Sequence, residues 1–162
     1  MLWTLRRAVV NSVGASPLMP RAGRWALLRL FGVDAAAWNI RERCFFGGSD
    51  ITLGRGTFVN QGCVFDNLGP IRIGARCAIG MEVMFAASTH EAGTPEQRAG
   101  APAGAPVTVE DGCWIGSRAV LLPGAHVAAG AIVASGSVVR GRLDPHCLYA
   151  GVPARKVRAL DP

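Results

Sequence analysis

Hydrophobic positions between residues 107 and 139 recur every six residues. An aliphatic residue stands at Val109, Ile115, Leu121, Val127, Val133 and Val139, and a small residue lies four places after each of the first five. Neither an α-helix, with a period of about 3.6, nor a single strand, with a period of about 2, gives this spacing. It is typical of a parallel β-helix, in which one side chain per hexad enters a narrow core and glycines relax the bends.

The same hexad extends upstream with one interruption. Core positions fall at Leu53, Val59 and Phe65, the turn sequence DNLGP at residues 66–70 shifts the phase by two, and the pattern resumes at Ile73, Ile79 and Phe85. Three hexads make one triangular coil, so the regular hexads supply about four coils. We therefore predict an all-β domain over residues 37–162, built as a parallel β-helix.

Two segments do not carry the repeat. Residues 86–106 are polar and rich in Gly, Pro and Ala, and we expect this long loop to protrude from the domain toward a neighbouring subunit. Residues 1–36 form an N-terminal helical attachment, in which Pro20 followed by residues 21–31 predicts a short helix that Gly32 ends. That helix should pack against the end or the flank of the β-helix.

Composition and charge narrow the class of protein. The 162 residues, half of them hydrophobic, suffice for one core. The net charge of +6 suits a phosphate-rich ligand or an anionic surface, whereas the absence of basic runs interleaved with aromatic residues argues against nucleic acid. Basic residues cluster near the N-terminus; a solvated face is the default interpretation, and peripheral contact with an anionic membrane or a lipid-linked substrate is the alternative.

Cysteine spacing indicates buried thiols. Cys63, Cys77 and Cys113 occupy small inward positions of the hexad, and no C-x-x-C pair occurs in the chain. Free thiols that pack as small apolar residues are compatible with a reducing compartment. We therefore expect a cytoplasmic protein with no metal.

Four short motifs add a resemblance to a known family. They are STH at residues 88–90 within the extruded loop, WIGS at 114–117, ASGSVV at 134–139 and GVPAR at 151–155. With the hexads, over roughly residues 40–160, they resemble the hexapeptide-repeat acyltransferases. The most similar branch holds the maltose and galactoside O-acetyltransferases, the nodulation acetyltransferases and the colanic-acid-type exopolysaccharide acetyltransferases. This resemblance implies a left-handed parallel β-helix, a homotrimer with active sites between subunits, and acetyl-CoA as donor.

The resemblance also assigns reacting groups. Acyl transfer to a hydroxyl needs a base, donors for the oxyanion and a hold on the donor's phosphates. His90 matches the family's catalytic base, and a neutral imidazole can accept a proton. For the acceptor saccharide, Asn60 matches a family position and Asp66 competes with Asn67 for the next one. Trp114 should be an exposed indole that the donor or a partner subunit covers.

The donor is assigned to a second set of residues. Ser117 and Ser135 resemble backbone contacts to acetyl-CoA, and the N–H of Ser117 is a candidate oxyanion donor. Arg155 and Arg158 match positions that hold the nucleotide phosphates of CoA. Arg140 stands near a position where relatives often carry a lysine.

Three functional hypotheses follow. The first is an acetyl-CoA-dependent O-acetyltransferase acting on a saccharide in polysaccharide or glycolipid biosynthesis. The second is an N-acetyltransferase of the same superfamily on an amino sugar or antibiotic, and the third is a non-catalytic scaffold. A γ-class carbonic anhydrase, which shares the fold, is disfavoured because His90, His126 and His146 lack its H-x4-H pair.

Overall fold

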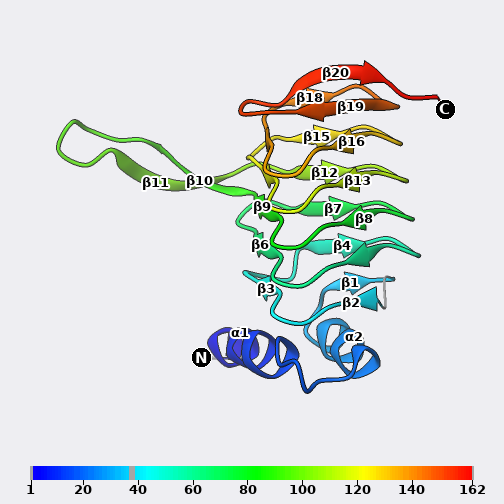
Figure 1. Cartoon of the computed structure of the whole chain (residues 1–162). Helices are drawn as coiled ribbons and strands as arrows, with labels where there is room; N and C mark the ends of the chain where they lie inside the picture. The colour runs from blue at the N-terminus through cyan, green and yellow to red at the C-terminus, as the bar shows by residue number, and fades with distance from the viewer. Residues whose placement is uncertain (1, 37–38, 162) are drawn as a thin grey trace.

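The computed structural model describes residues 2–36 and 39–161 as a parallel β-solenoid of about six turns with a helical cap (Figure 1). The turns stack three strand columns, and each column is one sheet. The regular hexads account for about four of these turns, so counting hexads alone underestimates the number of turns in the solenoid. The first coil and the last one lack the full hexad but still pair with their neighbours, and for this reason periodicity alone misses them.

Each sheet collects one strand from every coil. The first sheet contains β1 (Asp34–Ala35), β4 (Ile51–Leu53), β7 (Ile71–Ile73), β12 (Val107–Val109), β15 (His126–Val127) and β18 (Arg142–Leu143). The second contains β2 (Asn39–Ile40), β5 (Phe58–Val59), β8 (Ala78–Ile79), β13 (Trp114–Ile115), β16 (Ile132–Val133), β19 (Cys147–Ala150) and β20 (Arg155–Ala159). The third contains β3 (Phe45–Phe46), β6 (Val64–Asp66), β9 (Met84–Ala86), β14 (Val120–Leu121) and β17 (Val138–Val139).

Strand register follows the hexad count. Thr108 pairs with His126 and Ile115 with Val133, a step of one regular coil. Leu53 pairs with Ile73, a step longer by the two residues that the turn at 66–70 adds. All twelve hexad core positions predicted from the sequence are buried. The phase slip is therefore a longer coil and not a break in the stack.

Aromatic side chains form a column inside the first three coils. The ring of Phe65 stacks on Phe46 at 4.8 Å and on Phe85 at 5.0 Å, with nearly parallel planes. All five cysteines are buried and free. They pack in the core as the small residues that the hexad demands.

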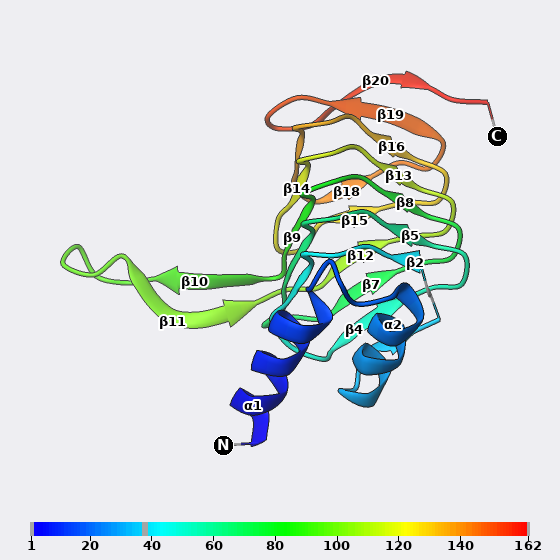
Figure 2. The same cartoon turned by 60° about the horizontal axis from the view of Figure 1, so that its bottom comes forward.

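Residues 86–106 leave the solenoid as an ordered hairpin instead of a structureless loop. Strands β10 (Ser88–Ala92) and β11 (Ala99–Gly104) pair antiparallel, and Figures 1 and 2 show the hairpin extending sideways, at a steep angle to the stack of coils. The prediction that this segment protrudes is confirmed. The sequence does not predict the pairing of β10 with β11, because a segment of Gly, Ala and Pro has no alternation of polar and apolar residues.

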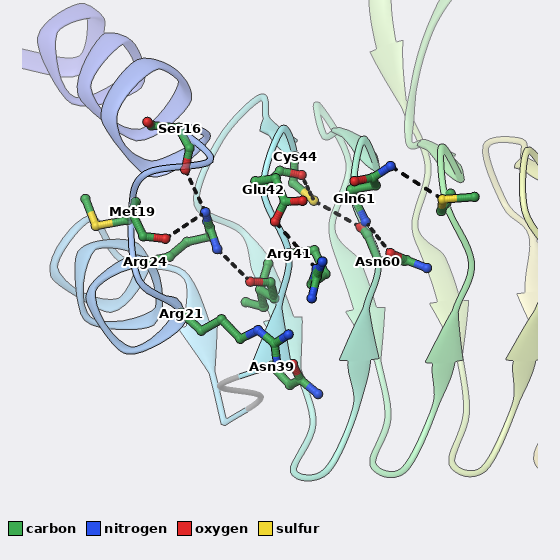
Figure 3. Close-up of polar contacts among 12 residues, drawn as sticks. Ser16, Met19, Arg21, Arg24, Asn39, Arg41, Glu42, Cys44, Asn60 and Gln61 are labelled. Atoms are coloured by element: carbon green, nitrogen blue, oxygen red, sulfur yellow. Dashed lines mark hydrogen bonds and ion pairs between the residues drawn. The ribbon is translucent and has the colours of Figure 1, made fainter.

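Helices close the N-terminal end of the stack. The predicted helix is present as α2 (Arg21–Leu30), whereas α1 (Leu2–Val9) and the short π-helix η1 (Val10–Gly14) were not foreseen. Arg24 of α2 is 2% exposed and donates to four carbonyls, those of Gly14, Ser16, Met19 and Ile40, at 2.6–3.1 Å. Figure 3 shows its bonds to Ser16 and Met19. The N-terminal arginines were expected to lie on a solvated face, and Arg24 is an exception to this expectation.

At the other end, β20 runs antiparallel along β19. Within the described parts of the chain, no helix has the length and apolar character needed to cross a membrane.

Candidate active site

His90 lies on β10, and its ring is oriented by the opposite strand of the hairpin. Its Nδ1 atom is 2.9 Å from the carbonyl oxygen of Gly100 on β11. A carbonyl can only accept, so Nδ1 carries the hydrogen of a neutral ring and Nε2 keeps a free lone pair. The exposed imidazole is thus held in the tautomer that a general base requires.

Ser88 ties the base of the hairpin to the solenoid. Its hydroxyl donates to Oδ1 of Asp66 at 2.9 Å and accepts the backbone N–H of Leu68 at 2.8 Å. Because Ser88 is two residues from His90 on the same strand, these bonds fix the direction in which the catalytic candidate leaves the solenoid. The STH motif singles out Ser88, but its anchoring role and the contact with Gly100 were not predicted, since these contacts join segments about ten to twenty residues apart.

A polar hollow of about 450 Å³ opens beside this anchor. Its lining includes Asp66, Asn67 and Ser88 from the solenoid side and Arg7 from α1. Both competing candidates for the acceptor position therefore face the same space. Asp66 is committed to Ser88 through one oxygen, whereas the buried Oδ1 of Asn67 has no partner among the described residues. Either side chain could bind a hydroxyl of an acceptor here.

A second group of candidates lies at a different corner of the triangular solenoid. We call it the serine corner: the bends between the second and third sheets at Asn60, Gly80, Gly116–Ser117 and Ala134–Ser135. Glycine is required in this stack, because a Cβ on Gly80 would lie 2.5 Å from the nitrogen of Ser117, and one on Gly116 2.4 Å from that of Ser135. The coils therefore present successive backbone bends at close spacing.

Two adjoining hollows meet at Ser135 of this corner. One, of about 850 Å³, is bordered by Met81, Ser117 and Arg118; the other, of about 620 Å³, is bordered by Trp114, Leu148 and Arg158. Trp114 is 56% exposed on β13, as expected for an indole awaiting a ligand or a partner. An extended ligand could lie from Ser117 past Ser135 to Arg158.

The other residues predicted to bind the donor or the acceptor do not all lie at the serine corner. Arg155 and Arg158 both lie exposed on β20. Arg140 follows β17 and faces solvent at the corner between the third and first sheets, so it does not line the serine-corner hollows of its own chain. Asn60 sits at the serine corner, where its Oδ1 accepts the N–H of Gln61 at 2.9 Å (Figure 3).

One chain does not bring the base and the groove together. His90, Asp66 and Ser88 belong to the corner between the third and first sheets, from which the hairpin departs, whereas Ser117 and Ser135 belong to the serine corner. The hairpin also points away from the coils (Figures 1 and 2).

His126 and His146 lie away from His90 and contact other parts of the solenoid. Nε2 of His126 is 2.5 Å from Oε1 of Glu110, on the outer wall of the first sheet. His146 packs over Gly130, where an added Cβ would lie 2.5 Å from its Nδ1. Among residues 2–36 and 39–161, no group of three or more His, Cys, Asp or Glu side chains is arranged to hold a metal ion.

Sequence comparisons give relatives of one kind. The family model "Bacterial transferase hexapeptide (six repeats)" matches residues 106–141. A Schizosaccharomyces pombe protein named as an acetyltransferase is 29% identical over 153 residues, covering 94% of this chain and 74% of that protein. The galactoside O-acetyltransferase of Escherichia coli K12 is 27% identical over 129 residues, covering 80% and 64%. The chain also spans 57% of the length of Staphylococcus aureus relatives that are 32% identical.

Solved structures give the same result. The hexapeptide-repeat-containing acetyltransferase VCA0836 of Vibrio cholerae superposes with a TM-score of 0.82 at 26% identity, over 100% of this chain and 94% of that one. Its complex with acetyl-CoA gives a TM-score of 0.78 at 28% identity, over 98% and 85%. The solenoid is thus the left-handed parallel β-helix of these proteins.

Proposed function

We propose that this chain, which belongs to the hexapeptide-repeat acyltransferase superfamily, transfers an acetyl group from acetyl-CoA to a hydroxyl of a saccharide. The observation that carries the proposal is the ring of His90, whose Nδ1 is bound by the carbonyl of Gly100 and whose Nε2 is free to accept a proton. The E. coli relative is named for O-acetylation of a galactoside, and the V. cholerae structure holds acetyl-CoA. Polysaccharide or glycolipid biosynthesis is the proposed setting.

The proposed reaction is direct transfer in a ternary complex. Nε2 of His90 takes the proton of the acceptor hydroxyl, and the hydroxyl oxygen attacks the thioester carbon. The backbone N–H of Ser117 stabilises the oxyanion, the carbon–sulfur bond then breaks, and the departing CoA sulfur takes the proton from His90, which regenerates the base. An acyl-cysteine intermediate is disfavoured because all five cysteines are buried in the core.

The donor is assigned to the serine corner. We propose that the pantetheine arm follows Ser117 and Ser135, and that Arg155 and Arg158 hold the nucleotide phosphates through their guanidinium groups. Arg140 would reach a donor bound to a neighbouring subunit. Asn60, Asp66 and Trp114 would contact the saccharide.

We further propose a homotrimer whose hairpins complete the sites. The base and the groove occupy different corners of one chain, so the hairpin of one subunit must reach the serine corner of the next. The division into an attachment at 1–36 and a β-helix domain at 37–162 remains part of this proposal; residues 37 and 38 lie outside the described residues. Free buried thiols support a cytoplasmic setting.

The first experiment measures thiol release from acetyl-CoA with a panel of sugars and amino sugars. Wild type, His90→Ala and the matched histidine control His126→Ala are compared. We expect release that depends on a hydroxyl acceptor and falls by about 10²-fold or more in His90→Ala alone. Release only with amines would favour the N-acetyltransferase, and no binding of CoA would favour the scaffold.

Subunit mixing tests the shared site. His90→Ala lacks the base, and Ser135→Trp blocks the groove at an exposed bend. If each site takes its hairpin and its groove from different chains, co-expressed equal amounts should recover about a quarter of the wild-type activity. Sites formed within one chain would recover none.

A further inference from the structure

The N-terminal cap, which we define as residues 2–33, holds most of the net charge. Residues 1–33 contain five arginines and no acidic residue, whereas the rest of the chain has 12 basic and 11 acidic residues. Arg24 is buried and bound to carbonyls, which leaves Arg6, Arg7, Arg21 and Arg29 exposed. The protein is thus strongly cationic at one end and nearly neutral elsewhere.

Large apolar side chains are exposed on the same cap. Leu18 is 90% exposed, Leu30 76% and Leu5 67%, and Val13 is also exposed. On α2 the exposed residues Ala22, Ala26, Arg29 and Leu30 have helical spacing, while Leu28 is buried against the solenoid. Leucines and arginines are therefore both exposed on the cap, where the core does not use them.

A narrow recess lies beside α1. Arg6 and Arg7 border it, and its other walls are mainly apolar, from Val10, Phe31 and Phe46. Arginines beside apolar side chains are a combination found on helices that lie at a membrane interface.

The position of the cap leaves it free to meet a flat surface. Figure 1 shows α1 and α2 at one end of the stack and β20 at the other end. The hairpin departs sideways from the third coil (Figures 1 and 2). Contact through the cap would therefore not cover the hairpin.

We infer that the N-terminal cap docks on a bilayer that contains anionic phospholipids. The exposed leucines enter the interface, and the exposed arginines bind the lipid phosphates. This inference rests on the charge and exposed side chains of the cap and does not depend on acetyl transfer. Of the exposed cap arginines, Arg7 also borders the hollow beside Asp66 and Ser88, so the charge reversals are placed at Arg6 and Arg29. The hairpin follows β9, which lies two coil spacings, about 10 Å, from β3 in the first coil. If the cap docks on a bilayer and the chain also acetylates saccharides, the hairpin is therefore close to saccharides that are attached to lipids.

Vesicle co-sedimentation of the full-length protein tests the inference. Vesicles of phosphatidylcholine alone are compared with vesicles containing about 30 mol% phosphatidylglycerol, an anionic content at which electrostatic attraction is measurable. The charge-reversal pair is Arg6→Glu with Arg29→Glu, and the matched control is Arg55→Glu with Arg98→Glu, two exposed arginines outside the cap. A third variant, Leu18→Ser with Leu30→Ser, removes the apolar contacts.

We expect wild type and the control to bind anionic vesicles and to bind phosphatidylcholine at least about tenfold more weakly. The cap charge reversal should lose at least about tenfold in affinity, and the leucine variant should lose affinity also at high salt. Equal losses in the cap and control pairs would overturn the inference, as would absence of wild-type binding. A smaller oligomer for the leucine variant in sedimentation velocity would assign the surface to a second copy instead.

Discussion

The coils of the solenoid and the β10–β11 hairpin position their side chains by different means. In the coils, the large and the small inward residue of each hexad are buried and packed between the coils above and below, and each coil repeats the last. In the hairpin, the strand residues are mostly exposed, and its direction depends on the two hydrogen bonds of Ser88. The repeated coils thus supply most of the stability, whereas the proposed catalytic base lies in the β10–β11 hairpin, which does not carry the repeat. Variants in the two regions should separate the two properties.

Phe65→Ala should have the largest effect, on stability. The ring is fully buried between Phe46 and Phe85, so its removal leaves a cavity and should cost about 3–5 kcal/mol of unfolding free energy. Urea unfolding measures the loss, with Leu30→Ala as an exposed control. Turnover per folded molecule should stay near wild type; a loss under about 1 kcal/mol would contradict the packing described for this column.

Ser88→Ala should affect activity more than stability, the opposite of Phe65→Ala. It removes the two hydrogen bonds of the Ser88 hydroxyl, each worth about 1 kcal/mol, and leaves the backbone bonds of Ala87 at the hairpin base. We therefore expect kcat/KM to fall roughly tenfold, and the unfolding free energy to fall by at most about 2 kcal/mol, less than in Phe65→Ala. Steady-state kinetics and thermal unfolding measure the two effects. Thr94→Ala at the hairpin tip is the control, and an equal fall there would remove the special role of the anchor.

Arg158→Ala should affect donor binding alone. Its guanidinium is exposed on β20, where one phosphate contact is worth up to about 1 kcal/mol, so KM for acetyl-CoA should rise about two- to fivefold with kcat unchanged. Initial rates at saturating acceptor provide the measurement, with Arg55→Ala as the control. An unchanged KM would take Arg158 out of the phosphate site.

Glu110→Gln should give the smallest effect, on the outer wall of the coils. The hydrogen bond with His126, and then the N–H of Ala129, lower the pKa of Glu110 from its ordinary value of 4.5. The side chain is 37% exposed, so solvent screens the pair and limits its contribution to less than about 1 kcal/mol.

The sign of that contribution sets its pH dependence. A pKa lower in the folded than in the unfolded state stabilises the fold above pH 4.5, and the contribution disappears as the pH falls through the folded value. The difference in unfolding free energy between wild type and Glu110→Gln should therefore be fully present at pH 7 and should shrink as the pH is lowered below 4.5, with exposed Glu91→Gln as control. A difference that grows on acidification would contradict this assignment.

The sequence predicts the coils well because a six-residue period is a local signal. It also predicts that residues 86–106 protrude, since they lack any period. The contact of His90 with Gly100 and the anchoring of Ser88 were not predictable, because both depend on cross-strand register in a hairpin of Gly, Ala and Pro. Arg24 shows the same limit: composition cannot tell a solvated arginine from one enclosed by four carbonyls.

The two ends of the solenoid have a consequence for self-association. Parallel coils leave strand edges at each end that could pair with another molecule. Here the α2 helix with its buried Arg24 covers one end, and β20, running antiparallel to β19, covers the other. A head-to-tail contact that does not close yields a filament of indefinite length. The antiparallel strand β20 therefore leaves no parallel edge at the end of the second sheet for the first coil of another copy to extend.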